Sequence, residues 1–423
     1  MNGLSRRELM GAGLALAAMV PATAKADLRH AASAVSPTDQ DYWREVAGQY
    51  DVTDEVIQLE NGNWGIMARP VLEAYGRHLA TVNRRNSFYS RRELVPDLMR
   101  IRARVAANLG CDPAEIAFTR GATESLLGLI GGYNRLRPGD TVLYADLDYD
   151  SMQSAMVWLK QRRGVEVATL ALPQPATYQN VIDAYEQALA ANPHTKLMLL
   201  THVSHRTGLV LPVSEIIAIA RSRGVDVIVD SAHAWGQLDF KLSDLNADFV
   251  GLTCQKWIGS PMGVGVMYIR RDRITDIDAP MGIESGPAND AFSRVHTGTS
   301  DYAAYLTVSE ALDFHEKIGA AAKEVRLRHL RDRWAEPLRG FGKLEILTPS
   351  DPRLTCAITS FRLSGQTSLA ENKALSRLLL ERFNIFTVER DGVASGACVR
   401  VTPSVFTNES DVDKLVEALK ALA

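Results

Sequence analysis

The stretch TCQKWIGSPMGVGVMYIR, residues 253–270, decides the fold, because it sets one lysine, Lys256, between two apolar runs. The run DFVGL at 248–252 precedes the lysine and GVGVMYI at 263–269 follows it, and short apolar runs of this kind predict buried strands. Most lysines are solvated surface residues. A lysine held between two buried strands is either an uncharged residue without a chemical role or a reactive group. The residues at neighbouring strand ends decide between these two interpretations.

Strands and helices alternate through the middle of the chain. Further β-rich runs stand at residues 115–119, 141–146, 165–172, 196–203 and 225–230, and helical patterns at 178–191 and 213–222 lie between several of them. This alternation predicts an α/β fold with a mostly parallel sheet of about seven strands, covered by helices on both faces. A helix is predicted after the loop at Asn61–Gly65, a further helix at 90–110, and a long helical pattern covers 303–334.

The last part of the chain has a different pattern. The runs LEILTP, TCAITSFRL, NIFTVE and CVRVTP predict strands, and two helical stretches accompany them. We therefore predict an N-terminal arm at 27–69 that joins the small domain, a large cofactor-binding domain at 70–310, and a smaller α+β C-terminal domain at 311–423.

Composition argues against several classes of protein. The 423 residues are 46% hydrophobic and 23% charged, which is typical of a globular protein with a full core. The formal net charge of −3 and the lack of a long basic run argue against a nucleic-acid partner. No apolar run reaches the roughly 18–20 residues that a membrane span needs. The four cysteines are scattered and form no metal-binding pair, so we predict neither stable membrane insertion nor a metal.

The first 26 residues have the layout of a cleavable export signal. Arg6 and Arg7 precede a mildly apolar stretch, and the small residues Ala24 and Ala26 form an A-x-A cleavage pattern. The adjacent arginines favour the twin-arginine route, which exports folded proteins. The Tat translocase is therefore a predicted partner and the periplasm the predicted location, with an ordinary amphipathic helix as the alternative.

Loops at the strand ends carry unusual residues, and ligands of open α/β sheets bind outside the carboxyl ends of the strands. FTRGATESLLGLI has a glycine turn with Thr123 at a helix start, which is either a phosphate cradle or a common helix cap. Asp230 ends the run VIVD and His233 follows it, either as an N-cap and a packed histidine or as functional groups. His202 and His205 follow a third strand in THVSH.

Taken together, these residues suit one cofactor. Pyridoxal phosphate (PLP) needs a lysine that condenses with its aldehyde, an acid that faces its ring nitrogen, and a cradle for its phosphate. Lys256 and Asp230 would supply the first two, and Asp230 would keep the ring nitrogen protonated, so that the ring withdraws electrons from the substrate α-carbon. We therefore predict PLP as the cofactor, with Lys256 and Asp230 as catalytic residues.

Several motifs resemble a known family. DSAHAWGQ, TCQKWIGSPMGVGVMYIR, VHTGTSDYAAYLTVSEAL and VRVTPSVFTNESDVDKLVEAL resemble the class V aminotransferases, which are fold-type I PLP enzymes. LENGNWG and SHRTGLVLPV resemble the isopenicillin-N epimerase-like branch. Combined with the export signal, the chain is similar to the exported periplasmic enzymes of pyoverdine siderophore maturation. The resemblance covers nearly all of the chain after residue 26 and implies a homodimer, but it does not imply one particular reaction.

The resemblance also implies roles for individual residues. Lys256 matches the lysine that bonds the cofactor, and Asp230 matches the partner of its ring nitrogen. Phosphate contacts are implied for Gly121, Ala122, Thr123, Thr253 and Gln255, and for Thr299 across a subunit interface. Ring contacts are implied for Tyr149 by stacking, for His205 near the ring hydroxyl and for His233 beside it. Arg400 matches the arginine that binds the substrate α-carboxylate, with Asn63 and Arg390 as further substrate-side candidates.

The leading hypothesis is an exported enzyme that acts at the α-carbon of an amino acid or an amino-acid-derived group, free or in a peptide. Its chemistry would be transamination, epimerisation or a tailoring reaction of the oxidative decarboxylation type. A cysteine desulfurase or lyase is the alternative enzyme. A desulfurase is disfavoured, because Cys398 stands two residues before Arg400 on a predicted strand and not on an upstream loop. An inactive periplasmic binding protein would not need both Asp230 and Lys256.

The export motif generates a first prediction. Changing Arg6 and Arg7 together to lysine should leave the uncleaved precursor in the cytoplasm, because a receptor reads the arginine pair and not only its charge. Cell fractionation and N-terminal sequencing check this, and the exported unaltered protein should begin at Asp27. An unchanged periplasmic yield of the variant would contradict the twin-arginine assignment.

Overall fold

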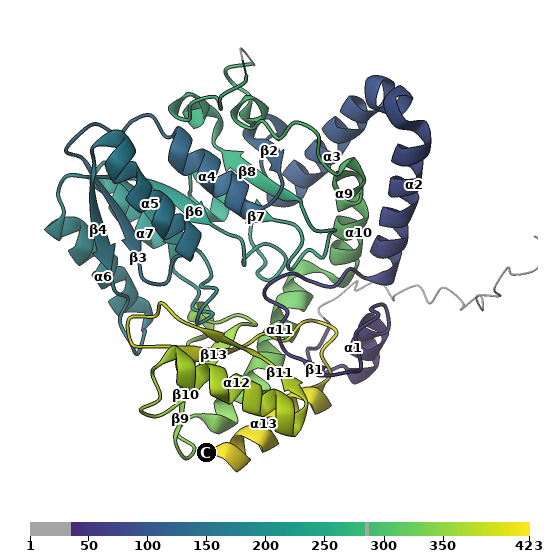
Figure 1. The fold of residues 1–423 in the computed structure, drawn as a ribbon, viewed down its shortest axis with the longest axis vertical. Coiled ribbons are helices and arrows are strands. Elements are labelled where there is room, and N and C mark those ends of the chain that lie inside the picture. Colours follow the sequence, from purple (N-terminus) through teal and green to yellow (C-terminus); the bar gives the residue numbers. More distant parts are fainter. Residues whose placement is uncertain (1–34, 284–286) are drawn as a thin grey trace, which may run out of the picture.

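The computed structural model describes residues 35–283 and 287–423, so the predicted export signal at 1–26 lies outside the described residues. A seven-stranded sheet with its helices forms the larger part of the molecule, and a smaller C-terminal domain lies below it in the view of Figure 1. No helix in the described ranges is long and apolar enough to cross a membrane.

The large sheet contains seven strands, as the sequence predicts. In spatial order they are β2 (Ile116–Thr119), β8 (Gly265–Ile269), β7 (Phe249–Thr253), β6 (Asp226–Asp230), β5 (Thr195–Thr201), β3 (Thr141–Ala145) and β4 (Glu166–Leu170). Strand β8 is antiparallel to both of its neighbours, and all pairs from β7 to β4 are parallel. The prediction of an α/β fold with a mostly parallel sheet is therefore confirmed.

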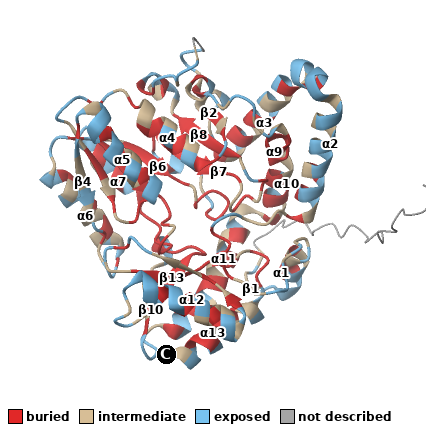
Figure 2. Ribbon diagram, in the orientation of Figure 1, coloured by how far each residue is buried: buried red, intermediate tan, exposed pale blue. Residues whose placement is uncertain are grey.

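Two apolar cores enclose this sheet, because successive side chains of a strand point to opposite faces. In β6, Val227 and Val229 belong to one core, and Ile228 between them belongs to the other. Strand β7 is buried along its whole length, whereas β4 at the sheet edge is largely accessible (Figure 2). A strand covered on both faces must be apolar throughout, which explains why these strands read as continuous hydrophobic runs.

The main helices of this part are α2 (Arg69–Arg92), α3 (Leu94–Leu109), α4 (Ala122–Gly132), α5 (Asp150–Arg163), α6 (Tyr178–Ala191), α7 (Val213–Ser222) and α10 (Val308–Ile318). Two helix predictions need correction. The helix expected at 90–110 begins at Leu94, because residues 90–92 complete α2. The long pattern at 303–334 divides into α9 (Tyr302–Leu306), α10 and α11 (Ala320–Ala335). Gly319 has φ = 91°, a conformation that glycine adopts without steric cost, and it ends α10.

The C-terminal domain has its own antiparallel sheet and core. The sheet order is β12 (Val388–Arg390), β13 (Cys398–Val401), β10 (Thr359–Leu363) and β9 (Leu344–Ile346), with α12 (Leu369–Phe383) and α13 (Glu409–Leu422) packed nearby. The predicted strand NIFTVE is split in two. Its first half, β11 (Ile385–Phe386), pairs with β1 (Ile57–Gln58), and its second half is β12, which pairs with β13.

An early segment of the chain reaches the C-terminal domain. After α1 (Gln40–Ala47), β1 pairs in parallel with β11, and Glu60 forms a bridge with Thr402, just after β13. Figure 1 shows α1 and β1 beside the C-terminal domain and apart from the large sheet. From here on, the arm means residues 57–65, which are a part of the longer N-terminal arm predicted at 27–69. The arm passes the junction between the two parts, where the carboxyl ends of the large-sheet strands also lie.

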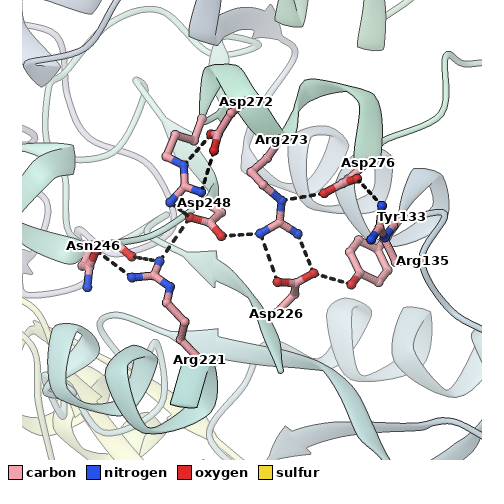
Figure 3. A network of polar contacts seen from close by, with 10 residues as sticks. Tyr133, Arg135, Arg221, Asp226, Asn246, Asp248, Asp272, Arg273 and Asp276 are labelled. Atoms are coloured by element: carbon pink, nitrogen blue, oxygen red, sulfur yellow. Dashed lines mark hydrogen bonds and ion pairs between the residues drawn. The ribbon is translucent and has the colours of Figure 1, made fainter. Parts of the chain in front are cut away.

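The amino ends of β6 and β7 carry a network of charged groups (Figure 3). Arg273 forms ion pairs with Asp226 at the start of β6 and with Asp248 just before β7, both at 2.6 Å, and with Asp276 at 2.5 Å. Arg221 lies 3.2 Å from Asp248 as well. The network therefore joins these two strands at the ends opposite to Asp230 and Thr253.

This network generates a second prediction. Arg273→Ala should cost about 2–4 kcal/mol of stability, because it leaves partly buried carboxylates without their shared cation. Thermal unfolding measures the loss as a lower melting temperature. The control Arg44→Ala removes an ion pair whose side chains are 72% and 84% exposed, and it should leave the melting temperature unchanged. Equal losses in both variants would contradict the structural role of the network.

Candidate active site

A cavity of about 890 Å³ lies where the large sheet, the C-terminal domain and the arm meet. The ends of β5, β6 and β7 contribute Thr201, Asp230 and Thr253, as expected for a ligand site of an open α/β sheet. Of the predicted site residues, those in its wall are Asn63, Gly121, Ala122, Thr123, Tyr149, His205, Asp230, His233, Thr253, Gln255, Lys256, Arg390 and Arg400. Thr299 is exposed and lies outside the wall.

The amine of Lys256 is enclosed in this cavity. Its Nζ lies 2.8 Å from Nε2 of His233. Burial lowers the pKa of Lys256 to about 8, although the negative charge of Asp230 acts in the opposite direction. The pKa of His233 lies well below its ordinary value, chiefly because of burial and then because of the charge on Lys256, so this histidine is neutral. Near neutral pH, Lys256 is therefore available in both its charged and its uncharged form.

The peptide of Lys256 is held from two sides. On one side, the N–H of Gly65 in the arm donates to the carbonyl oxygen of Gln255 at 2.7 Å. A Cβ on Gly65 would stand 2.0 Å from the carbonyl oxygen of Lys256, so the arm can come this close only because position 65 is glycine. On the other side, the buried amine of Lys323 donates to the carbonyl oxygen of Trp257. These contacts fix the backbone from which the Lys256 side chain extends.

Asp230 is a buried carboxylate at the end of β6. Its Oδ1 accepts a hydrogen bond from the N–H of Ala232 at 2.9 Å. Burial raises the pKa of Asp230, while the Ala232 N–H and the charge of Lys256 partly offset this effect. Within the described ranges, Asp230 forms no ion pair. A buried carboxylate is stabilised when a cationic group is placed against it, so the site favours a ligand with a protonated nitrogen.

A turn before α4 offers donors for an anion. Gly121 has no side chain to act as an acceptor, so the first N–H groups of the helix, those of Ala122 and Thr123, donate to no side-chain cap. A Cβ on Gly265 in β8 would stand 2.5 Å from Cα of Gly121, which shows that the turn rests directly on the backbone of β8. The side-chain amide nitrogen of Gln255 lies beside this turn, since a Cβ on Gly121 would stand 3.9 Å from Nε2 of Gln255. These donors fit the phosphate of a cofactor.

Two aromatic rings stand together in the cavity wall. Tyr149 and His205 form a T-shaped pair with ring centroids 5.2 Å apart. The pKa of His205 is well below its ordinary value because of burial and, after that, because of nearby guanidinium groups, so the ring is neutral. His202 from the same loop lies outside the cavity wall and packs against Phe240. His202 is therefore a packed histidine and not a part of the cavity.

Arg400 in β13 is 1% exposed, and each of its three guanidinium nitrogens donates a hydrogen bond. Its Nη1 donates to the carbonyl oxygen of His205 at 2.7 Å, its Nε donates to Glu60 at 3.3 Å, and its Nη2 donates to the other carboxylate oxygen of Glu60. Nη2 of Arg390 lies 3.5 Å from Oε1 of the same glutamate. Burial lowers the pKa of Arg400 to about 10, which still leaves it charged at neutral pH.

Cys398 lies in β13 with Arg400, as its sequence position predicts. It is buried, and its Sγ is 3.9 Å from the carbonyl oxygen of Arg206. Burial raises the pKa of this thiol to about 11. Among the described residues, no cysteine lines the cavity. The described chain therefore provides no thiolate next to Lys256.

Several charged or titratable groups in or beside the wall were not predicted from the sequence: Glu60, Arg120, Glu124, Asp150, Arg294, His296, Glu389 and Asp391. For Glu60 the sequence gives only a weak signal, because a carboxylate just after β1 needs a cation if it is buried, but neither its burial nor its partner can be predicted locally. The other residues are single charges on helices, strands and loops, where isolated charges are common.

Known proteins resemble the chain over most of its length. The aminotransferase class-V family profile matches residues 68–415. Isopenicillin N epimerases of Streptomyces clavuligerus and Amycolatopsis lactamdurans are each 30% identical to it, over 396 and 399 residues, covering 90% of this chain and 98% of each relative. A putative L-cysteine desulfhydrase of Oryza sativa subsp. japonica is 25% identical over 407 residues, covering 87% of this chain and 83% of the relative.

Solved structures support the same fold. The apo cysteine desulfurase of Thermococcus onnurineus NA1 matches with a TM-score of 0.76 at 20% identity, covering 89% of this chain and 97% of that one. A mutant of C-DES, with glycine covalently linked to its PLP cofactor, matches with a TM-score of 0.76 at 22% identity, covering 88% of this chain and 98% of that one.

The predicted fold-type I architecture and the predicted cofactor are thus confirmed, and the cavity offers an amine, a buried acid and an anion cradle that fit this cofactor. The chain is a PLP-dependent enzyme that belongs to the class V aminotransferase family, in its isopenicillin N epimerase-like branch.

Proposed function

We propose that this enzyme acts at the α-carbon of an amino acid or of an amino-acid-derived group in a peptide. The observation that carries the proposal is one cavity that holds the Lys256 amine, the buried Asp230 carboxylate, an anion cradle and two arginines. The amine and the acid serve the cofactor, and the arginines suit the carboxylate of an amino-acid substrate.

PLP, when bound, withdraws electrons from the α-carbon of an attached amine and makes its α-proton acidic. Lys256 would hold the cofactor covalently. Asp230 would face the ring nitrogen and gain the cationic partner that its buried carboxylate lacks. The turn at residues 121–123, with Thr253 and Gln255, would hold the phosphate, and Tyr149 and His205 would flank the ring.

The amine of Lys256 is the group that would move the α-proton. Its lowered pKa lets the uncharged form take a proton and the charged form return it near neutral pH. The neutral ring of His233, 2.8 Å from Nζ, would keep the amine oriented. The atom that receives the proton decides between epimerisation and transamination. Arg400 would bind the substrate α-carboxylate, with Arg390 and Asn63 beside it.

We propose a homodimer with shared active sites. Thr299 is exposed and lies outside the cavity of its own chain, which suits a residue that contacts the phosphate in the neighbouring subunit. The same arrangement would use the surface around the cavity mouth as the subunit interface.

A carbon–sulfur lyase acting on a cysteine-like substrate is the second candidate, since one of the similar proteins carries the name putative L-cysteine desulfhydrase. A lyase of this kind needs no protein thiol. A desulfurase that passes sulfur to its own cysteine is less well supported, because Cys398 is buried and its thiol pKa is raised to about 11.

We also propose that the enzyme is exported by the twin-arginine route and works in the periplasm on a siderophore side chain. Arg6 and Arg7 support export, and the sequence resemblance to pyoverdine-maturation enzymes supports the substrate class. Both points rest on the sequence alone.

The decisive experiment incubates the purified holoenzyme in D₂O with free amino acids and with siderophore peptide precursors, and follows product mass and chirality. Deuterium at an inverted α-carbon indicates epimerisation, loss of the amino group indicates transamination, and sulfide release indicates a lyase. Absence of α-carbon chemistry with every amine tested would contradict the proposal.

The site generates a prediction for Lys256. Borohydride should fix the cofactor covalently on the peptide that contains Lys256, because only an amine of lowered pKa at this position reaches the cofactor aldehyde. Lys256→Ala should abolish both the label and the activity, whereas the surface variant Lys160→Ala should keep both. Peptide mass spectrometry locates the label. A label on a different lysine, such as the buried Lys323, would overturn the assignment.

A further prediction concerns Arg400. Arg400→Lys keeps the positive charge but loses the planar fork that matches a carboxylate. Substrate affinity should fall by about tenfold or more, since a charge-assisted pair is worth roughly 1.5–3 kcal/mol. The cofactor absorbance should stay unchanged. Steady-state kinetics and absorbance spectra check the two expectations, and unchanged turnover at low substrate concentration would remove Arg400 from the substrate site.

A further inference from the structure

Glu60 stands where a substrate carboxylate would be expected to bind. Nε and Nη2 of Arg400 form one of the two edges of the guanidinium that can pair bidentately with carboxylates. Both nitrogens donate to Glu60, one to each carboxylate oxygen. The third nitrogen, Nη1, donates to the carbonyl oxygen of His205 at 2.7 Å. In this conformation the Nε–Nη2 edge of Arg400 is therefore occupied by Glu60, and each nitrogen of its other edge, Nη1 and Nη2, already donates one hydrogen bond within the protein.

Arg390 differs from Arg400, because the N–H groups of its guanidinium have few hydrogen-bond partners. Its Nε is buried without a hydrogen-bond partner among the described residues. Its Nη2 is 3.5 Å from Oε1 of Glu60, and its Nη1 is 3.3 Å from the backbone oxygen of Glu389. Buried donors without partners are costly and rare. The two guanidinium groups thus share one carboxylate, and a second carboxylate would complete both pairs.

The arm holds the backbone of Glu60 and packs against the guanidinium of Arg400. Thr402 donates to the carbonyl oxygen of Leu59 at 2.7 Å, and Asn61 donates to the carbonyl oxygen of Thr402 at 3.2 Å. A Cβ at Gly62 would stand 2.8 Å from Nη2 of Arg400, so the arm lies this close to the guanidinium only because position 62 is glycine. Oε1 of Glu60 accepts from Nη2 of Arg400 and also lies 3.5 Å from Nη2 of Arg390, so a short movement of the carboxylate transfers it from one arginine to the other.

We propose that Glu60 is an exchangeable internal ligand of the arginine pair, which yields the bidentate edge of Arg400 to the carboxylate of the substrate and moves to Arg390. This inference rests on the proposed role of Arg400 and adds a specificity-determining residue to that site. An amine without a carboxylate cannot displace Glu60, so Arg400 stays closed to it. A substrate with a carboxylate opens the site by exchange, and its affinity is set by competition with Glu60.

The test measures binding of propionate to the holoenzyme by titration calorimetry. Propionate has a carboxylate but no amine, so it reports on the arginines without reacting with the cofactor. Glu60→Gln should bind propionate about tenfold more tightly than the unaltered enzyme, because the competing carboxylate is gone. The matched control is Glu345→Gln, which also removes a carboxylate paired with an arginine of the C-terminal sheet, Arg362, at 2.7 Å, but outside the cavity. Its affinity for propionate should not change.

A second variant keeps the proposal testable if Glu60→Gln folds poorly. Arg390→Gln removes the group that receives Glu60 after exchange, so it should weaken propionate binding by about tenfold. Unchanged or weaker binding by folded Glu60→Gln, or unchanged binding by Arg390→Gln, would overturn the exchange. An enzyme that shows the expected propionate affinities but no α-carbon chemistry would contradict the proposed function and leave the role of Glu60 standing.

Discussion

The parallel pairing of β6 with β7 is the constraint on which the site depends. Asp230 ends β6 opposite Gly251 of β7, and the chain after β7 leads directly to Lys256. Gly251 also matters for the other face, because a Cβ there would stand 2.6 Å from Cγ of Leu126 in α4. The close approach of α4 to β7 sets the anion turn beside the same strand ends. One strand pair thus positions the acid, the amine and the phosphate cradle.

Burial acts on the two ends of these strands with opposite results. At the amino ends, Arg273 joins several carboxylates, so the charges satisfy one another without a ligand. At the carboxyl ends, burial raises the pKa of Asp230 and lowers that of Lys256, and the first N–H groups of α4 have no side-chain cap. The first arrangement stabilises the fold. The second leaves buried polar groups without partners, and a cofactor with a cationic ring nitrogen and a phosphate can supply those partners.

Much of this could be predicted from sequence, because the decisive signals are local. Continuous apolar runs identify doubly covered strands, and Lys256 and Asp230 stand out as charges at the ends of such runs. The missed features depend on distant contacts. The segment NIFTVE is split because its two halves pair with two different sheets. The role of Glu60 depends on its contact with Arg400, 340 residues later in the chain. Periodicity within one segment carries no information on such partners.

The course of the arm has a consequence for the order of assembly. Its residues pair with β11 and Thr402, so some of the first described residues contact some of the last. At typical synthesis rates, the arm waits for tens of seconds before its partners leave the ribosome. Contacts so far apart in sequence form late, after the two sheets have their own cores. The pocket around Lys256 is therefore completed last, when the arm packs against the two folded sheets. A chain truncated near its C-terminus would leave the arm without its pairing partners.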